Sequence, residues 1–432
     1  MTDLKRYLYQ PIPNIQITLF RWCLAIVLLI QSVFFISQGF VEQNIVAPMM
    51  LFPFFSKLTP LSENILVAIS YIMLISNIGM LFNKYARIST IIFCACFSYF
   101  WILDKGYFNN HYYFISIMCF LLALVEERSS FKELILTPRF KIISLQLMVF
   151  IIYFISGINK LNPYWLFDLQ PITHILEFKS EITGDYFYNN KLLVILLTYC
   201  GLAFDLLIGF LLFNKHTRWL AFSMVIIFNF CNYFLFIDVG EIGVFPFIMI
   251  TTLILFFDTH LLNKLINKRF KTSNRPNINL KKHPILFNFI VIFIIIQLLI
   301  PFRHFLFKGY VDYNGVGQRF SWRMKLMYKE SNIQYYITDQ STNQKYEVNV
   351  KKMLTTKQYN NLMYYPDLIV PLAKKIKQEA QDKFNIKSPK ITCEYDIQFM
   401  GKSRPQKLFS PEIDLAMIAE NKLTHKWIYP LK

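Results

Sequence analysis

The stretch that decides the fold class is LLVILLTYCGLAFDLLIGFLLF, residues 192–213. Its 22 residues include one charged side chain, Asp205. As a helix rising 1.5 Å per residue it would be about 33 Å long, enough to cross a hydrocarbon core of roughly 30 Å. We therefore expect a transmembrane helix here, with a carboxylate near its middle.

The rest of the chain has the same apolar character. Its 432 residues are 55% hydrophobic and 17% charged, with a mean hydropathy of +0.37, which is too apolar for a soluble protein of this length. Nine apolar windows are long enough to be candidate spans, the third and fourth being short: 17–38, 64–82, 88–103, 109–125, 142–158, 192–213, 219–236, 241–257 and 285–303. We predict an all-α, polytopic membrane bundle of about nine transmembrane helices in residues 1–303, followed by a small α+β extramembrane domain in residues 304–432.

Basic residues set the expected orientation. If the N-terminus is cytoplasmic, the cytoplasmic segments hold seventeen Lys and Arg residues and the opposite loops hold five, as the positive-inside rule requires. The C-terminal domain then lies on the outer face, which is periplasmic in a bacterial inner membrane. The net charge of +18 is thereby explained by the bilayer as partner, and we expect no nucleic-acid partner.

The tail after the last window alternates between strand and helix patterns. Residues 333–350 read as a hairpin, and Thr355 with Gln358 has the spacing of a capping box. Pro366 can begin a second helix, and residues 391–399 alternate strictly as a half-buried strand that turns Cys393 to the core. These patterns predict the α+β domain.

Motifs for nucleotide and metal chemistry are missing from the sequence. It contains no P-loop, no glycine-rich dinucleotide turn, no His-Glu-x-x-His and no paired Cys-x-x-Cys, so we expect no metal site. Six of the seven cysteines lie in apolar windows, which predicts no disulfide framework.

Two charged residues stand out in the membrane half. An ionised Asp205 costs several kcal/mol in a span unless it is paired or faces a cavity, so it is either a structural carboxylate with an Arg, Lys or Asn partner or a functional, coupling one. Lys160 follows the fifth window, beside an aromatic anchor, Trp165. It either snorkels to the interface or is desolvated and acts as a base.

Polar side chains also gather at the outer interface. Asn110 and His111 open the fourth window and can donate to a developing oxyanion or orient a quinol hydroxyl, although an interfacial His is more often just a satisfied polar residue. Around the last window lie further candidates that suit either recognition of a carboxylate or an anionic lipid headgroup: Arg303, His304, Arg319, Ser321, Trp322 and Arg323.

These segments together resemble the vitamin K-dependent gamma-glutamyl carboxylases. The matching stretches run in the right order from about residue 15 to the C-terminus, and each is modest while the ordered set is specific: NNHYY at 109–113, YFISGINKL at 153–161, DLLIGFLLF at 205–213, IGVF at 242–245, RHFL at 303–306, RFSWRM at 319–324, PDLI at 366–369, SPEIDL at 410–415 and WIYPL at 427–431.

The resemblance implies a reaction and roles. In that family a lysine matching Lys160 deprotonates vitamin K hydroquinone, and a histidine matching His111, here beside Asn110, assists. Oxygen addition to the quinol anion yields a strongly basic alkoxide, which removes a γ-proton from a peptidyl glutamate. The resulting carbanion captures CO2, and the products are quinone epoxide and γ-carboxyglutamate. The resemblance thus implies vitamin K hydroquinone (menaquinol or a related quinol) with O2 and CO2, no metal, and a glutamate-containing protein or peptide at the outer face. Arg303, His304, Arg319, Ser321 and Trp322 are the expected substrate-binding residues.

Two departures from the family pattern affect what we expect. Asn229 stands where the animal enzymes carry a histidine associated with activity. The sequence also stops soon after Trp427, without the long extension that grips a propeptide in the animal enzymes, so we do not expect propeptide-directed, processive carboxylation.

Two further hypotheses remain beside carboxylation. Quinol oxygenation could serve a different acceptor or proceed uncoupled from carboxylation, as Asn229 suggests. The chain could instead be a non-enzymatic quinone- or lipid-binding membrane protein, or a transporter that uses Asp205 as its coupling carboxylate.

Overall fold

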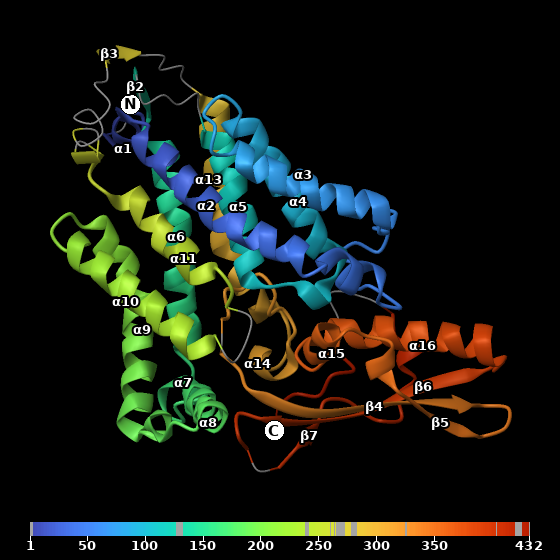
Figure 1. Ribbon diagram of the computed structural model, residues 1–432. Helices are drawn as coiled ribbons and strands as arrows, with labels where there is room; N and C mark the ends of the chain where they lie inside the picture. The colour runs from blue at the N-terminus through green and yellow to red at the C-terminus, as the bar shows by residue number, and fades with distance from the viewer. Residues whose placement is uncertain are drawn as a thin grey trace.

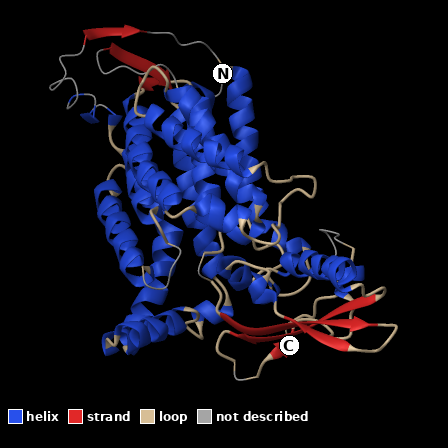
Figure 2. Ribbon diagram, turned by 45° about the vertical axis from the view of Figure 1, so that its right-hand side comes forward, coloured by secondary structure: helices blue, strands red, loops and turns tan. Residues whose placement is uncertain are grey.

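Long helices form one end of the molecule and a small sheet forms the other. The computed structural model describes residues 3–126, 133–237, 242–259, 261–262, 264, 273–277, 283–324, 326–402, 404–419 and 426–431. Figure 1 shows the helices packed as a bundle, with the N-terminus at the far end from the C-terminal strands. Figure 2 places the strands at the two opposite ends of that bundle.

Six described helices are long and apolar enough to cross a membrane, which makes the chain an integral membrane protein. They are α2 (Ile15–Ser37), α4 (Ala86–Leu103), α6 (Phe140–Lys160), α9 (Lys191–Phe213), α10 (Arg218–Phe236) and α13 (Pro284–Leu299) with the turn that extends it to Leu306. The stretch at 192–213 is thus a helix of spanning length, as predicted.

The other three windows form shorter apolar helices, so the prediction of about nine spans is confirmed only in part. They are α3 (Glu63–Gly79), α5 (Asn110–Val125) and α11 (Phe245–Thr251), which continues as a 3₁₀ turn to Phe256. Ten of the 16 residues of α5 are buried in the protein. Hydropathy alone therefore could not separate a helix that faces protein from one that crosses lipid.

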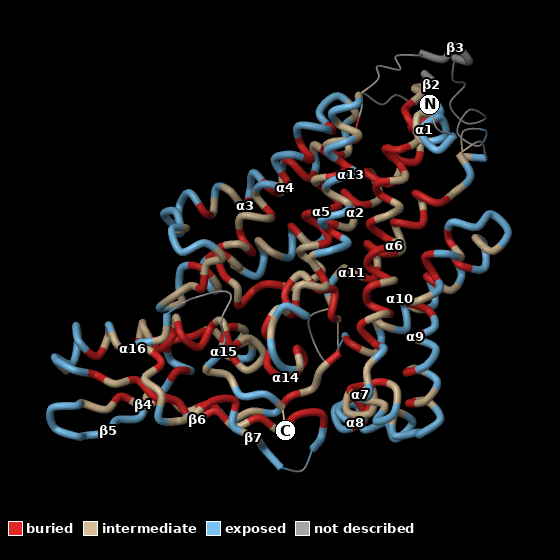
Figure 3. Tube along the Cα trace, turned by 180° about the vertical axis from the view of Figure 1, so that it is seen from behind, coloured by how far each residue is buried: buried red, intermediate tan, exposed pale blue. Residues whose placement is uncertain are grey.

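Helix α6 lies at the centre of the bundle. In its most apolar window 67% of the residues are buried inside the protein, against 17% for α13. In Figure 3, α6 is mostly buried, whereas the outer side of α9 is exposed. Polar side chains on α6 therefore face protein rather than lipid.

A three-stranded sheet at the N-terminal end was not predicted. Strand β2 (Glu133–Pro138) pairs antiparallel with β1 (Pro11–Pro13) and parallel with β3 (Ser273–Asn277). Strands of three to six residues leave no periodic signal that stands out beside apolar windows of 16 to 22 residues.

The C-terminal sheet has the order β5-β4-β6-β7. The predicted hairpin is confirmed as β4 (Lys329–Asp339) and β5 (Lys345–Val348), with Tyr335 opposite Val348. The predicted strand is β6 (Pro389–Phe399), which pairs with β4 along its whole length and buries Cys393, and β7 (Gln406–Lys407) completes the sheet. All seven cysteines are free thiols.

Two predicted helices cover this sheet. The capping box of Thr355 and Gln358 begins α15 (Thr356–Leu362), as predicted. Pro366 begins a 3₁₀ turn that leads into α16 (Ile369–Phe384), so the regular helix begins three residues later than predicted. Ile369, Leu372 and Ile376 are buried in the core beneath α16.

A polar contact joins the sheet-containing region to the helical bundle. Gln358 Nε2 donates to Asp104 Oδ2 at 2.6 Å and to the carbonyl of Met50 at 3.0 Å. Asp104 is the C-cap residue of α4. Burial raises the pKa of the Asp104 carboxyl to about 6, although hydrogen bonds from Gln358 and from the backbone of Gly106 favour the charged form. The junction thus holds a carboxyl that titrates in mildly acidic solution.

Candidate active site

Two glycines let α6 and α9 approach closely. A Cβ on Gly157 would lie 2.9 Å from the backbone nitrogen of Leu206, and a Cβ on Gly209 would lie 2.4 Å from the ring of Phe150. Small residues at such positions are the usual device for close helix packing in membranes. The close approach brings the last turn of α6 beside the middle of α9.

Lys160 and Asp205 form an ion pair between these two helices. The Lys160 ammonium donates to Asp205 Oδ2 and, at 3.1 Å, to Ser156 Oγ, and it lies 5.1 Å from the centre of the Trp165 ring. Lys160 is 7% exposed and Asp205 is 3% exposed. Lys160 is therefore desolvated, so the snorkelling alternative is wrong, and Asp205 has the lysine partner that one of its two interpretations required.

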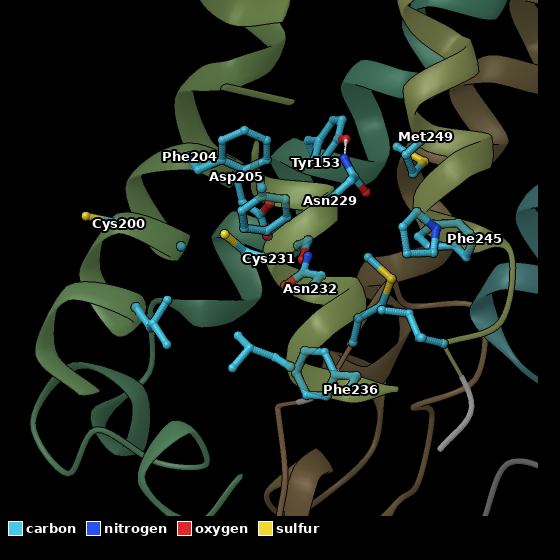
Figure 4. Close-up of a pocket in the computed structure, with 18 of the residues that line it drawn as sticks. Tyr153, Cys200, Phe204, Asp205, Asn229, Cys231, Asn232, Phe236, Phe245 and Met249 are labelled. Atoms are coloured by element: carbon cyan, nitrogen blue, oxygen red, sulfur yellow. Dashed lines mark hydrogen bonds between the residues drawn. The ribbon is translucent and has the colours of Figure 1, made fainter. Parts of the chain in front are cut away.

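The pair borders a cavity of about 390 Å³ inside the helical bundle. Figure 4 shows side chains from α6, α9, α10 and α11 pointing into it. Most of the lining is apolar or aromatic, for example Phe204, Phe228 and Met249. The cavity has the size and character of a site for a small apolar ring with a few polar groups.

The cavity reaches the surface of the bundle that faces lipid. Cys200 on α9 and Cys231 on α10 both line it, and both are exposed. Their neighbours Tyr199 and Phe234 are 44% and 62% exposed, so the surroundings of this opening are apolar. An apolar molecule dissolved in the bilayer can reach the cavity between α9 and α10.

His111 lies on the same cavity as Lys160, as the sequence suggested. Its ring stacks on Phe245 of α11, with the centroids 3.8 Å apart and the planes 7° apart. The side chain of Asn109 caps α5 by accepting from the backbone nitrogen of His111. Asn110 does not line this cavity; its Nδ2 donates to the Arg323 carbonyl at 3.3 Å.

A second polar group in the cavity comes from α10. Asn229, 3% exposed, donates through Nδ2 to the Val225 carbonyl at 2.9 Å and to the Tyr153 hydroxyl at 3.4 Å. Figure 4 shows this last contact as a dashed line. The residue that departs from the family pattern therefore lies in the same cavity as Lys160.

A network behind the cavity fixes the end of α6. The Arg323 guanidinium binds both oxygens of Asp312, with Nε 2.7 Å from Oδ1, and its Nη1 donates to Asn159 Oδ1 at 2.9 Å. Asn159 Nδ2 in turn donates to the Ser321 carbonyl at 2.9 Å. Asp312 lies in α14 (Val311–Asn314) and is fully buried.

The five predicted substrate-binding residues lie near this network and do not line the cavity. Arg319 forms an ion pair with Asp367, and Arg303 donates to the Arg319 carbonyl. Ser321 donates to the Gln318 carbonyl, and His304 Nδ1 lies 2.8 Å from the Pro301 carbonyl. The Trp322 ring is buried against Tyr113, at 5.2 Å between centroids.

Sequence reasoning missed three residues of the site. Tyr153 and Ser156 lie seven and four residues before Lys160, a spacing that puts all three on one face of α6, so helical periodicity could have found them. Asp312 had no such signal, because its partner Arg323 is chosen by the tertiary fold.

Comparison with known families identifies both halves of the chain. The HTTM domain model matches residues 9–260, and the model of the vitamin K-dependent gamma-carboxylase lumenal domain matches residues 282–432. No solved structure matches the chain. The lumenal-domain match puts the C-terminal region on the non-cytoplasmic side of the membrane. The two models cover nearly the whole chain in sequence, and the chain belongs to the vitamin K-dependent gamma-carboxylase family.

Proposed function

We propose that this protein carboxylates the γ-carbon of glutamate in a protein or peptide at the outer face, coupled to oxygenation of a vitamin K-type hydroquinone to its epoxide. The observation that carries the proposal is the desolvated Lys160–Asp205 pair, which shares an apolar, lipid-accessible cavity with His111. The family match supports a carboxylase-like activity.

The cavity residues fit a bound quinol. Aromatic and aliphatic side chains suit the faces of a naphthoquinone ring, while Lys160, Asp205, His111 and Asn229 supply polar groups for its oxygens. When bound, reduced vitamin K supplies with O2 the strong base that removes the γ-proton of glutamate before CO2 is added.

The chain's own residues handle the first proton. Lys160 is the ammonium of this ion pair and has no lone pair for a proton, so the Asp205 carboxylate is the group that would receive one, and the pair would then be cationic. That positive charge would favour negative charge on the nearby oxygen of a bound quinol, and the apolar walls of the cavity would strengthen the attraction. His111, held flat against Phe245, is placed to orient a ring oxygen.

The acceptor's glutamate would bind near the end of the last span. Among the described residues Arg303 donates to the carbonyls of Ile300 and Arg319 and pairs with no carboxylate, so its charge is available to one. The Asp367 side chain already neutralises Arg319. Arg303 is therefore the strongest of the five candidates, with His304, Arg319, Ser321 and Trp322 shaping its surroundings.

We also propose the membrane orientation and the domain division. The seventeen-to-five distribution of basic residues supports a cytoplasmic N-terminus and, in a bacterium, an inner-membrane location with the C-terminal domain in the periplasm. Two hydrophobic cores support a division near residue 303, with Trp322 packed in the core of the bundle and Phe52 in that of the C-terminal region.

The test is incorporation of labelled bicarbonate into a glutamate-rich peptide by purified protein with reduced vitamin K and O2. Lys160→Ala should lower incorporation at least about 100-fold, since a positioned base is worth roughly 10²–10⁴. Lys191→Ala, which changes an exposed lysine at the start of α9, should leave it unchanged.

Loss of folding must be separated from loss of the base. Lys160→Ala leaves Asp205 buried without its cation, so the double variant Lys160→Met/Asp205→Leu, which removes both charges, serves as the folding control. Full incorporation by a folded Lys160 variant, or none by the wild type above a boiled sample, contradicts the proposal.

A second candidate function is quinol oxygenation with another acceptor or without carboxylation. Asn229 favours it, because this amide lines the cavity where the animal relatives carry a histidine. Production of quinone epoxide without labelled peptide would support this function over carboxylation.

A further inference from the structure

Tyr153 and Asn229 form a second polar position in the cavity, apart from the Lys160–Asp205 pair. Tyr153 is 4% exposed and Asn229 is 3% exposed, and both line the cavity. The orientation of the Asn229 amide is fixed by chemistry, because the Val225 carbonyl only accepts and must face Nδ2. Asn229 Oδ1 is therefore the amide atom that points away from the Val225 carbonyl and can accept a hydrogen bond.

Each side chain of this position keeps unused hydrogen-bonding capacity. Among the described residues the Tyr153 hydroxyl accepts from Asn229 and has no acceptor for its own proton, and Asn229 Oδ1 receives no donor. Buried polar groups are normally satisfied, and leaving one unsatisfied costs about 1–3 kcal/mol. A hydroxyl on a ligand would satisfy both groups at once, accepting from Tyr153 and donating to Asn229.

The spacing along α6 suits an aromatic ring with oxygens at opposite ends. Tyr153 and Lys160 are two helical turns apart, or about 10.5 Å along the axis. Side chains from positions this far apart on one helix can contact the two para oxygens of a single ring, with a hydrogen bond of about 2.8 Å at each end. Phe204 supplies an aromatic wall of the same cavity, stacked on Phe228 at 3.9 Å and edge-on to Tyr153.

We propose that Tyr153 and Asn229 bind the ring oxygen of a hydroquinone that lies opposite the oxygen facing Lys160 and Asp205. The inference rests on the proposed function for the class of ligand and extends it to two residues with separate roles. Tyr153 donates to the oxygen in both redox forms. Asn229 accepts a proton that only the reduced form carries, so the position favours the hydroquinone over the quinone.

The experiment compares two ligands that bind without turnover. One is a 2-methyl-1,4-naphthoquinone with a short alkyl tail, and the other is the naphthol that lacks the oxygen at position 4. Binding to full-length protein in detergent is measured by calorimetry in the absence of acceptor peptide. The single oxygen of the naphthol should go to the charged pair, because hydrogen bonds to ionised groups are stronger.

Tyr153→Phe should weaken binding of the quinone about 5- to 10-fold, the loss of one hydrogen bond. It should change binding of the naphthol less than about two-fold on the same grounds. With the hydroquinone under argon, Asn229→Leu should weaken binding by a similar factor while leaving the quinone almost unaffected. Ser223→Leu, at an exposed position on α10 that does not line the cavity, is the control and should alter none of these values.

The outcomes separate this inference from the proposed function. The inference is overturned if Tyr153→Phe weakens binding of both ligands equally or of neither. It is also overturned if the wild type binds no quinone, whether or not carboxylation occurs. Selective weakening in a protein that carboxylates nothing upholds the inference and contradicts the carboxylase proposal.

Discussion

The Lys160–Asp205 pair in the cavity and the Arg323–Asp312 pair behind it are both buried ion pairs, but their surroundings differ. Arg323 uses Nε, Nη1 and Nη2 on Asp312 and Asn159, and it does not line the cavity that Lys160 borders. Lys160 holds Asp205 and Ser156 at the wall of a cavity of about 390 Å³. A buried charge thus becomes chemically available only where space lies next to it.

The largest effect expected is on the pair behind the cavity. Arg323→Met should lower the free energy of unfolding by about 3–5 kcal/mol, because it leaves Asp312 buried without a cation. The double variant Arg323→Met/Asp312→Leu should recover most of that loss. Both are measured as thermal unfolding midpoints in detergent.

The same double variant can break the comparison. If Arg323 and Asp312 have only a structural role, the carboxylation rate of the Arg323→Met/Asp312→Leu variant should be within about 10-fold of the wild-type rate. The rate of the Lys160→Met/Asp205→Leu variant should remain at least about 100-fold lower than that of the wild type. Equal activities in the two double variants would mean that the cavity does not distinguish the pairs.

A smaller effect is expected at Asp104, where the two ends of the molecule meet. An unfolded chain gives up this proton near pH 4, and burial raises the folded pKa to about 6. Between these values the folded state binds more protons, so stability falls as pH rises through that range, by at most about 3 kcal/mol.

Asp104→Asn should therefore flatten the dependence of the unfolding midpoint on pH between about 4 and 6. Asp168→Asn, at an exposed position, should keep the wild-type slope. An unchanged slope in Asp104→Asn would show that this carboxyl is not the group that titrates.

The smallest effect concerns the approach of α6 to α9. In Gly157→Ala the added Cβ would meet the Leu206 backbone, so the helices must shift and the protein should lose about 1–3 kcal/mol of stability. Gly201→Ala on α9, where a Cβ meets nothing within 4 Å, is the matched control and should not destabilise. If Gly157→Ala unfolds at the wild-type midpoint, the close contact does not hold the pair together.

Sequence patterns were sufficient where one residue type stands out from its surroundings. Lys160, Asp205 and His111 are polar groups in apolar windows, and the structure brings all three to one cavity. The hairpin and the capping box follow from local rules and were predicted correctly. Local rules apply because the partners are only a few residues apart.

The remaining features depend on partners far apart in the chain. Nothing near Asp312 indicates that Arg323 binds it while also reaching Asn159, 164 positions earlier. Three of the five residues predicted to bind substrate are basic, but one of these, Arg319, pairs with Asp367 once the chain folds. Composition could not show which cations would be neutralised.

Asn159 and Lys160 are neighbours in the chain, and they face different parts of the molecule. Asn159 is held by Arg323 and the Ser321 carbonyl, in the segment that leads to the C-terminal sheet, while Lys160 borders the cavity. A single peptide bond therefore links the outer region to the ion pair proposed to take the proton. A displacement of Ser321 or Arg323 would pull on the last turn of α6 through two hydrogen bonds to one side chain, with no long relay through the bundle.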